Sequence, residues 1–175
     1  MNEEPSPKKA KYAWAVLRVA LGWIFLWPFL DKTLGLGYAT PSSGAWIHGG
    51  HPTRGFLGGV DGWFAGAFNA MADSLLVEWL FMLGLLLIGL SLILGIGVRV
   101  GCYAGALMLL LMYLAELPFR ASTADGRGAN NPFLDDHIVY GIALIGLSLA
   151  QAGRTWSLGA WWSRRPIVQK HPWLE

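Results

Sequence analysis

The 175-residue sequence contains a single cysteine, Cys102. One thiol excludes an intrachain disulfide, a CxxC redox motif and a metal site built from several thiolates. The sequence also lacks a flavin or dinucleotide fingerprint, so the chain itself offers no visible site for a redox cofactor. Any redox chemistry must therefore use bound substrates or a partner protein.

Histidine is also scarce, with four residues in the chain. Only His137 lies near an apolar segment, which argues against a haem held by two axial histidines within helices. His48 and His51 stand three residues apart in a loop, but two imidazoles without a third ligand make a weak metal motif. We therefore predict no metal, haem or flavin.

Charged residues make up only 14% of the chain, and the net charge is +2. Soluble domains of this size are about a quarter charged. The thirteen cations are scattered along the chain, which argues against a nucleic-acid-binding protein. Hydrophobic residues reach 54%, and several of the ten tryptophans lie near the ends of apolar runs, as expected at the level of lipid headgroups. The sequence indicates an integral protein of the cell membrane, with the lipid bilayer as its main partner.

Four apolar segments each approach the roughly 20 residues that a helix needs to cross the hydrocarbon core. They are residues 13–30, 75–96, 100–117 and 132–152. Because period-two alternation is absent and membrane-buried backbone must satisfy its own hydrogen bonds, they are predicted to be helices rather than strands of a barrel. We predict an all-α, polytopic membrane protein with one membrane domain, a four-transmembrane-helix bundle. The first segment lacks a small-x-small cleavage pattern and is expected to be an uncleaved span.

Basic residues flanking the spans predict the orientation. If the N-terminus is inside the cell, eight basic residues lie on the cytoplasmic side and four lie outside, which favours cytoplasmic N- and C-termini. The inner set is Lys8, Lys9, Lys11, Arg99, Arg154, Arg164, Arg165 and Lys170, and the outer set is Lys32, Arg54, Arg120 and Arg127.

The connecting segments differ in character. Residues 31–74 form the predicted outer loop, which is rich in glycine and aromatic residues and is expected to be a structured cap. Within it, residues 58–72 have helical spacing and are expected to lie on the membrane surface or to dip into the outer leaflet. Residues 153–175 form the predicted cytoplasmic tail, whose tryptophans and arginines suit the membrane interface.

Small residues predict where the helices approach each other. Gly101 and Gly105 are four residues apart and so share one helical face, which favours a close helix contact. Ser91 with Gly95 and Gly141 with Gly146 give weaker signals of the same kind. Arg18 lies inside the first span, where it either snorkels to the inner face or forms a buried pair, and we favour snorkelling.

Polar side chains from the four spans converge on the outer side. Ionisable groups at this depth are costly unless paired or hydrated, so they indicate a functional site. The alternative is that they lie at the water interface and only mark helix ends. The candidate catalytic residues are Glu116, Asp136 and His137, and the candidate substrate-binding residues are Lys32, Arg120, Trp79, Tyr113 and Tyr140.

The start of the fourth span combines several signals. Asn131 is a suitable N-cap and Pro132 suits the first helical position. Carboxylates in the first turns complement the helix dipole, but capping does not explain His137. Asp136 and Tyr140 share a face. A histidine near a carboxylate can handle protons because imidazole titrates near neutral pH; the alternative is a satisfied polar residue.

Three motifs spread over nearly the whole chain resemble one family. They are Arg18-x-x-Leu21-Gly22-Trp23-Ile24-Phe25-Leu26 running to Leu30-Asp31-Lys32, Gly55-Phe56-Leu57-Gly58-Gly59, and Asn131-Pro132-Phe133-Leu134-Asp135-Asp136-His137. In these motifs the sequence resembles the DoxX/DoxD family of four-span membrane proteins, which includes the membrane subunit of thiosulfate:quinone oxidoreductase. The resemblance implies electron transfer from thiosulfate or a related sulfur compound to membrane quinone as co-substrate. It also implies a small partner subunit; a homo-oligomer is the alternative.

Two functions from different classes follow. The first is an oxidoreductase subunit, in which quinone rests against Trp27, Trp79, Tyr113 and Phe119 while His137 or Glu116 exchanges protons. The second is a non-catalytic membrane scaffold or accessory subunit of a redox complex. A small-solute transporter has little support unless the chain oligomerises, because the sequence shows neither a repeat nor a pair of broken helices.

Overall fold

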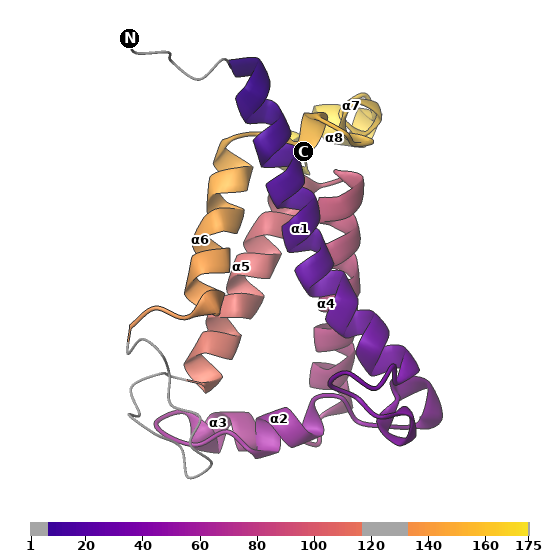
Figure 1. Cartoon of the computed structure of the whole chain (residues 1–175), viewed down its shortest axis with the longest axis vertical. Coiled ribbons are helices and arrows are strands. Elements are labelled where there is room, and N and C mark those ends of the chain that lie inside the picture. Colours follow the sequence, from indigo (N-terminus) through magenta and orange to yellow (C-terminus); the bar gives the residue numbers. More distant parts are fainter. Residues whose placement is uncertain (1–6, 117–132, 175) are drawn as a thin grey trace.

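Helices make up the regular structure of the computed structural model, which describes residues 7–116 and 133–174. Within those ranges there is no β-strand, so the all-α prediction is confirmed for the described residues. The longer helices are α1 (Pro7–Leu34), α4 (Leu75–Leu94), α5 (Val98–Ala115) and α6 (Asp136–Leu149) (Figure 1). The short helices are α2 (Arg54–Gly58), α3 (Ala65–Ala70), α7 (Gly159–Trp162) and α8 (Pro166–Lys170), and the 3-10 turns are η1 (Ser42–Gly44), η2 (Trp46–His48), η3 (Ala152–Arg154) and η4 (Pro172–Leu174).

Three helices in the described part of the chain are long and apolar enough to cross a membrane, which indicates a membrane protein. They are Ala10–Leu34, Leu75–Leu94 and Val98–Ala115. The fourth apolar helix, α6, has 14 residues, about 21 Å at the helical rise, whereas the hydrocarbon core is about 30 Å thick. The described helices therefore account for three of the four predicted spans.

The helix α6 begins later than the sequence predicts. Its N-cap is Asp135, which has an extended backbone and whose side chain accepts a hydrogen bond from the Ile138 N–H. The expected N-cap, Asn131, and the expected first helical residue, Pro132, lie outside the described residues. The prediction that the helix starts at Pro132 is wrong, because the carboxylate of Asp135 satisfies a free N–H of the first turn further along the chain.

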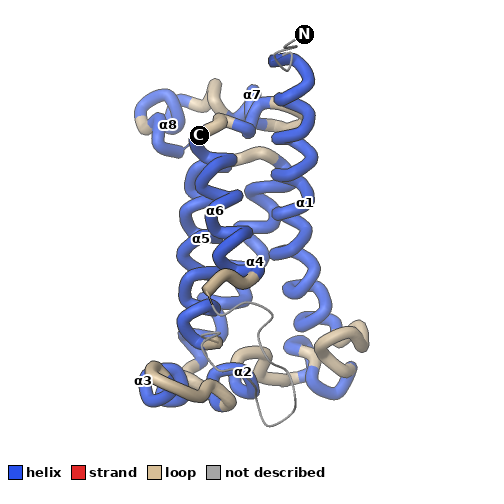
Figure 2. Tube along the Cα trace, turned by 60° about the vertical axis from the view of Figure 1, so that its left-hand side comes forward, coloured by secondary structure: helices blue, strands red, loops and turns tan. Residues whose placement is uncertain are grey.

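The long helices pack mainly in two pairs. α1 lies along α4 and α5 lies along α6, while α4 and α5 are joined by a tight turn at residues 95–97 (Figure 1). Residues 35–74 cover one end of the bundle, here called the loop end. Residues 150–174 and the start of α1 form the other, here called the tail end (Figure 2). The loop 35–74 contains the short helices α2 and α3, which lie across the loop end (Figure 1).

Glycines allow the closest helix contacts. A Cβ on Gly105 would lie 2.9 Å from Leu144 Cδ1 on α6 and 3.2 Å from Phe25 on α1, so the predicted contact face is confirmed there. Between α1 and α4, a Cβ on Gly22 would lie 3.1 Å from the Gly89 carbonyl oxygen. By contrast, Cβ atoms on Gly141 and Gly146 would meet nothing within 4 Å. That pair does not make the predicted helix contact.

Most of the core is apolar, with one charged exception. The largest fully buried side chain is that of Arg18, which is 0% exposed. Its guanidinium donates to the carbonyls of Leu92 and Ile93 near the end of α4, and to those of Thr155 and Trp156 in the tail at 3.0 Å each. Arg18 therefore does not snorkel, and it pairs with no carboxylate among the described residues. The prediction that favoured snorkelling is wrong, because helix-end carbonyls supply acceptors inside the bundle.

Candidate functional site

A buried carboxylate paired with a histidine lies at the loop end and is centred on Glu78, which is 4% exposed. Glu78 lies in the first turn of α4, where Ser74 caps the helix and accepts a hydrogen bond from the Val77 N–H. A carboxylate there is favoured by the positive end of the helix dipole. The helix start thus places a carboxylate just inside the bundle, under the loop.

Both oxygens of Glu78 have partners from the loop. Trp46 Nε1 donates to Oε1 at 2.9 Å, and His51 Nδ1 lies 3.1 Å from Oε2. With Glu78 ionised, Nδ1 of His51 carries the shared proton, because a carboxylate can only accept. Nε2 of His51 then has no hydrogen-bond partner among the described residues. This leaves the second ring nitrogen for a further group.

The surroundings of this pair are aromatic and open on one side. The ring of Trp46 meets the ring of Trp79 edge to face, with centroids 4.5 Å apart and an interplanar angle of 65°. Trp79 is 52% exposed, and the side chain of His51 is 41% exposed. The group therefore joins a buried carboxylate to a reachable imidazole beside an exposed indole.

A second buried carboxylate holds the same loop. Asp31 is 2% exposed and accepts hydrogen bonds from the N–H groups of Tyr38 and Ala39 at 3.3 and 3.0 Å. Its neighbour Lys32, one of the predicted substrate-binding residues, is half-buried at the end of α1. Asp31 is committed to backbone donors, so its role in the structure is to order the chain that follows α1.

The predicted catalytic histidine lies at the start of α6. His137 Nδ1 is 2.7 Å from Asp135 Oδ2, and the other oxygen of Asp135 caps the helix. Asp136 and Glu116 are both exposed. The structure therefore pairs His137 with Asp135, whereas no hydrogen bond or ion pair within residues 7–116 and 133–174 links it to Asp136 or Glu116.

The remaining predicted site residues are dispersed. The Tyr113 hydroxyl donates to the Phe133 carbonyl at 3.0 Å and so links the end of α5 to the chain before α6. Tyr140 packs against the hydrophobic core. Trp79 belongs to the Glu78 group described above, and Arg120 lies outside the described residues.

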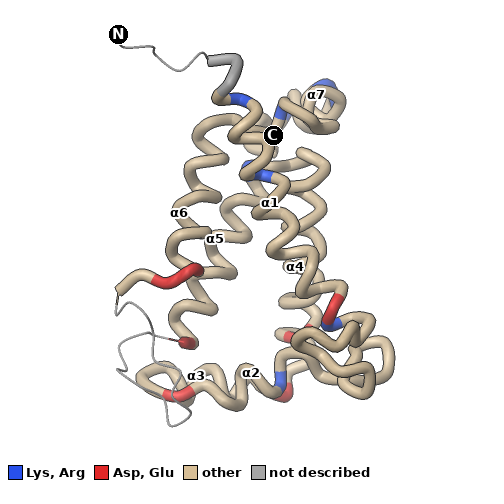
Figure 3. Tube along the Cα trace, viewed as in Figure 1, with Lys and Arg blue, Asp and Glu red and all other residues tan. Residues whose placement is uncertain are grey.

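The two acid-base pairs belong to different helix pairs. His51 and Glu78 lie with α1 and α4, and Asp135 and His137 lie with α6. At the loop end α1 diverges from α5 and α6 (Figure 1), and Figure 3 shows acidic positions both at the start of α6 and near the loop end of α1. Among the described residues, no hydrogen bond or ion pair joins the two pairs, so the single cluster expected from alternating span direction divides into two.

Two further findings bear on chemistry. Within the described ranges, no group of three or more His, Cys, Asp or Glu side chains is arranged to hold a metal ion. Cys102 is free and fully buried in the hydrophobic core. The side chains that remain for chemistry at the loop end are thus carboxylates, imidazoles and aromatic rings.

Spacing in the sequence does not connect Glu78 to His51 or Trp46. The partners are separated by 27 and 32 residues, and loop conformation rather than helical spacing brings them together. The sequence does contain a signal for this site. Glu78 stands next to Trp79 in a strongly apolar run, and a carboxylate in such a run requires a polar partner.

No known protein family, curated protein or solved structure matches this chain. The resemblance to the DoxX/DoxD family rests on the sequence motifs alone.

Proposed function

We propose that this chain is a membrane-integral subunit of a redox reaction that delivers electrons to membrane quinone, and that His51 and Glu78 exchange protons at the loop end. The observation that supports this most is the buried carboxylate of Glu78 in contact with the half-exposed imidazole of His51. The DoxX/DoxD resemblance supplies the reactants of the proposal, thiosulfate or a related sulfur compound as donor and quinone as acceptor.

The residues present suit a quinone. Quinone is a planar, lipid-soluble hydrogen acceptor whose reduction takes up protons together with electrons. Trp79 offers an exposed ring at the edge of the bundle, and His51 has a ring nitrogen left after its contact with Glu78. In this proposal His51 donates a hydrogen bond through Nε2, and Glu78 orients the imidazole through its contact with Nδ1.

The pair of His137 and Asp135 is the second candidate for the same role. It has the required contact, at 2.7 Å, but its carboxylate also caps α6, and both side chains are largely buried. The His51 pair is preferred because its imidazole is more exposed and lies beside an exposed indole.

A non-catalytic scaffold is the alternative function. It is favoured by the observation that Asp31 and Glu78 both direct their oxygens to donors of the loop 35–53. In that case the buried acids only shape a rigid cap, to which another subunit of a redox complex would bind.

The test uses purified protein in lipid nanodiscs, with thiosulfate as donor and a water-soluble quinone analogue as acceptor. Loss of a general acid-base group lowers turnover about 100-fold or more, so His51→Ala should do so. Because this variant also leaves Oε2 of the buried Glu78 without its loop partner, the thermal unfolding midpoint is measured on the same preparation and should fall only modestly. His48→Ala is the matched control, because His48 lies in the same loop and, among the described residues, its ring hydrogen-bonds to the Ser42 carbonyl and to no carboxylate. His137→Ala applies the same test to the second pair, His137 with Asp135.

Binding of the quinone analogue, measured by equilibrium dialysis, makes the test independent of the electron donor. Well-folded protein with neither turnover nor saturable quinone binding would contradict the redox proposal and favour the scaffold. Normal turnover in His51→Ala with loss in His137→Ala would move the proton-exchange site to α6.

We also infer that α6 and its flanking residues make a fourth crossing and that both termini are cytoplasmic. Large apolar side chains of α6 are exposed, including Val139, Ile142 and Leu149, as expected for a helix that faces lipid. With an even number of crossings both termini lie on the same side of the membrane. That side then carries eight of the twelve loop and tail cations, as is typical of the cytoplasmic side. A cysteine introduced at Gly49 should react with an impermeant thiol reagent in intact cells; reaction only after permeabilisation would reverse the orientation.

A further inference from the structure

The last part of the described chain, residues 155–174, is held to the bundle along one side. The Leu158 N–H donates to the Leu94 carbonyl at the end of α4, at 2.8 Å, and Arg18 donates to two carbonyls of this segment. Further along, Trp162 Nε1 donates to the Leu174 carbonyl at 2.7 Å. These bonds fix the first and the last parts of the segment, so its surface has a defined shape.

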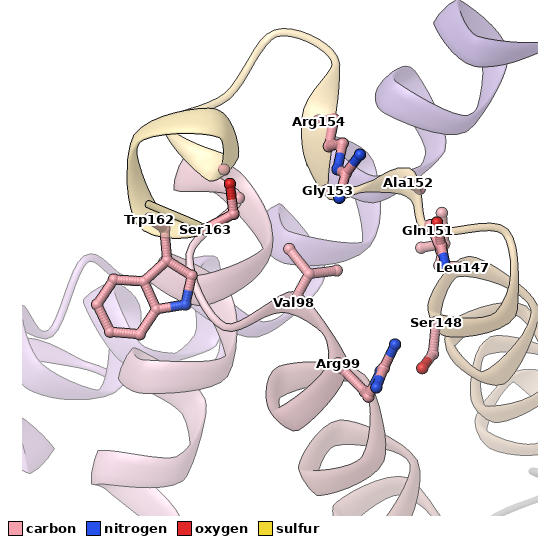
Figure 4. Close-up of a pocket in the computed structure, with 12 residues that line it drawn as sticks. Val98, Arg99, Leu147, Ser148, Gln151, Ala152, Gly153, Arg154, Trp162 and Ser163 are labelled. Atoms are coloured by element: carbon pink, nitrogen blue, oxygen red, sulfur yellow. The ribbon is translucent and has the colours of Figure 1, made fainter. Parts of the chain in front are cut away.

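The inner side of this segment packs on the helix ends. Figure 4 shows where it meets α5 and α6, around a pocket of about 40 Å³ that Trp162 lines from the tail and Val98 from α5. In α8, Val168 is buried. Figure 1 shows that the chain after α6 turns across the tail end of the bundle instead of continuing along α6. One side of the segment is thus covered by protein, and the other side is exposed.

The exposed side carries large apolar side chains. Trp161 and Trp173 are each at least half exposed, and so is Ile167, which precedes the buried Val168. Indole rings settle at the level of lipid headgroups, and apolar side chains of interfacial segments enter the boundary between headgroups and acyl chains. An apolar surface beside helices that suit a membrane therefore fits the interface of a bilayer.

Cations lie beside these apolar groups. Arg164 and Arg165 line a hollow of about 280 Å³ next to Trp161, and the guanidinium of Arg165 lies 3.8 Å from the centre of the Trp161 ring. Lys170 follows in the last turn of α8. All three cations are exposed, and neither Arg164 nor Lys170 has an ion pair within residues 7–116 and 133–174. Residues 150–174 include no aspartate or glutamate, so no neighbour in this segment neutralises them.

We propose that the exposed side of this segment docks on the membrane leaflet at the tail end and binds anionic phospholipid headgroups. The docking surface consists of Trp161, Arg164, Arg165, Ile167, Lys170 and Trp173. The arginines donate charged hydrogen bonds to lipid phosphates at the hollow, while the indoles and Ile167 enter the headgroup layer. Each cation near an anionic leaflet strengthens binding about fivefold.

Lipid suits the docking surface better than an acidic protein for two reasons. The helices α1, α4 and α5 are long and apolar enough to cross a membrane, so a segment bonded to the end of α4 stays within reach of a leaflet. The surface also places cations among exposed indoles, which is the pattern of an interfacial membrane segment. Glu78 lies at the other end of α4, so the proposal does not depend on the redox function.

The first test measures lipid preference on the full chain in a neutral detergent. Native mass spectrometry compares retained phosphatidylglycerol with phosphatidylcholine in the unaltered protein, in Arg164→Gln and in the double variant with Arg165→Gln. Arg54→Gln is the matched control, because it also removes one exposed cation but lies in α2 at the loop end. All these side chains are exposed, so the thermal unfolding midpoint should stay nearly unchanged.

We expect phosphatidylglycerol to be retained in preference to phosphatidylcholine. Arg164→Gln should lower this preference about fivefold and the double variant roughly 20-fold, whereas Arg54→Gln should change it less than about twofold. Equal retention of the two lipids by the unaltered protein, or an equal loss of preference in Arg54→Gln and Arg164→Gln, would overturn the proposal.

The second test locates the segment in a bilayer. A fluorophore attached to Ile167→Cys reports on the docking surface alone, because the native Cys102 is fully buried. In nanodiscs that contain phosphatidylglycerol, a spin-labelled lipid should quench this fluorophore more strongly than aqueous acrylamide does, and the double arginine variant should weaken the quenching by lipid. Quenching by acrylamide alone would place the segment in water and contradict docking. Protection from acrylamide by polyglutamate in that case would assign the surface to an acidic protein instead.

Discussion

At the loop end, two buried carboxylates accept hydrogen bonds from the loop, whereas at the tail end one buried guanidinium donates to four carbonyls. Asp31 and Glu78 bind N–H groups of residues 38–51, and Arg18 binds carbonyls of α4 and of the tail. At both ends irregular backbone packs against helices long and apolar enough to cross a membrane. In each place a charged side chain forms hydrogen bonds with polar groups that lipid could not satisfy.

The sign of each buried charge follows the direction of α4. This helix starts at the loop end, where free N–H groups and the positive end of the dipole favour the carboxylate of Glu78. It finishes at the tail end, where free carbonyls favour the guanidinium of Arg18. Gly95, in a left-handed conformation after α4, lies close to Arg18, since a Cβ there would be 2.8 Å from Nη1. The comparison teaches that one helix determines which charge is tolerated at each end.

The largest expected effect comes from breaking the tail end. Arg18→Met keeps an unbranched apolar side chain but leaves buried carbonyls of α4 and of the tail without a donor. Each unsatisfied group costs about 1–3 kcal/mol, so the free energy of unfolding should fall by at least about 3 kcal/mol. The thermal unfolding midpoint in detergent measures this change.

Two controls make the Arg18 result specific. Arg164→Met removes a positive charge from an exposed position of the tail, and should change the midpoint little. Arg18→Lys keeps a charge but has a compact donor head rather than a planar fork, and should recover only part of the loss. A midpoint for Arg18→Met equal to that of Arg164→Met would contradict the structural role of Arg18.

A smaller effect is expected at the loop end. Glu78→Leu removes the acceptor for Trp46 and the partner of His51, which should cost about 2 kcal/mol. Because these bonds hold a loop rather than two helices, the loop should open locally while the bundle remains folded. Limited proteolysis near residues 46–51 should accelerate, and the midpoint should fall less than in Arg18→Met.

The matched control at the loop end is Arg54→Ala. It breaks the 2.6 Å ion pair with Asp73, in which both side chains are exposed, and such pairs contribute about 0–1 kcal/mol. Its cleavage rate near residues 46–51 should stay close to that of the unaltered protein. An equal increase in the cleavage rate in Arg54→Ala and Glu78→Leu would show that any change in the loop exposes residues 46–51. It would contradict a specific role of Glu78 in holding this loop.

Several sequence predictions rest on local pattern and agree with the structure. Two apolar runs form helices close to the predicted bounds, Leu75–Leu94 against residues 75–96 and Val98–Ala115 against residues 100–117, whereas the first helix extends beyond the predicted residues 13–30 to Pro7–Leu34. The contact at Gly105 also follows from the spacing of small residues. By contrast, the start of α6 was misplaced because Asn131 and Asp135 both suit an N-cap, and local pattern does not choose between them.

Apolar content, helix length and the approximate order of the spans were determined by the sequence itself, because a hydrophobic run of about 20 residues has few alternatives to a membrane helix. The partners of Arg18, Glu78 and His137 were decided only by the tertiary structure. Arg18 contacts carbonyls up to 138 positions away, Glu78 meets its imidazole across 27, and His137 takes Asp135 rather than Asp136 through the turn before α6. A charged side chain in a low-dielectric interior binds whichever polar group the fold brings within reach, and sequence spacing does not record that distance.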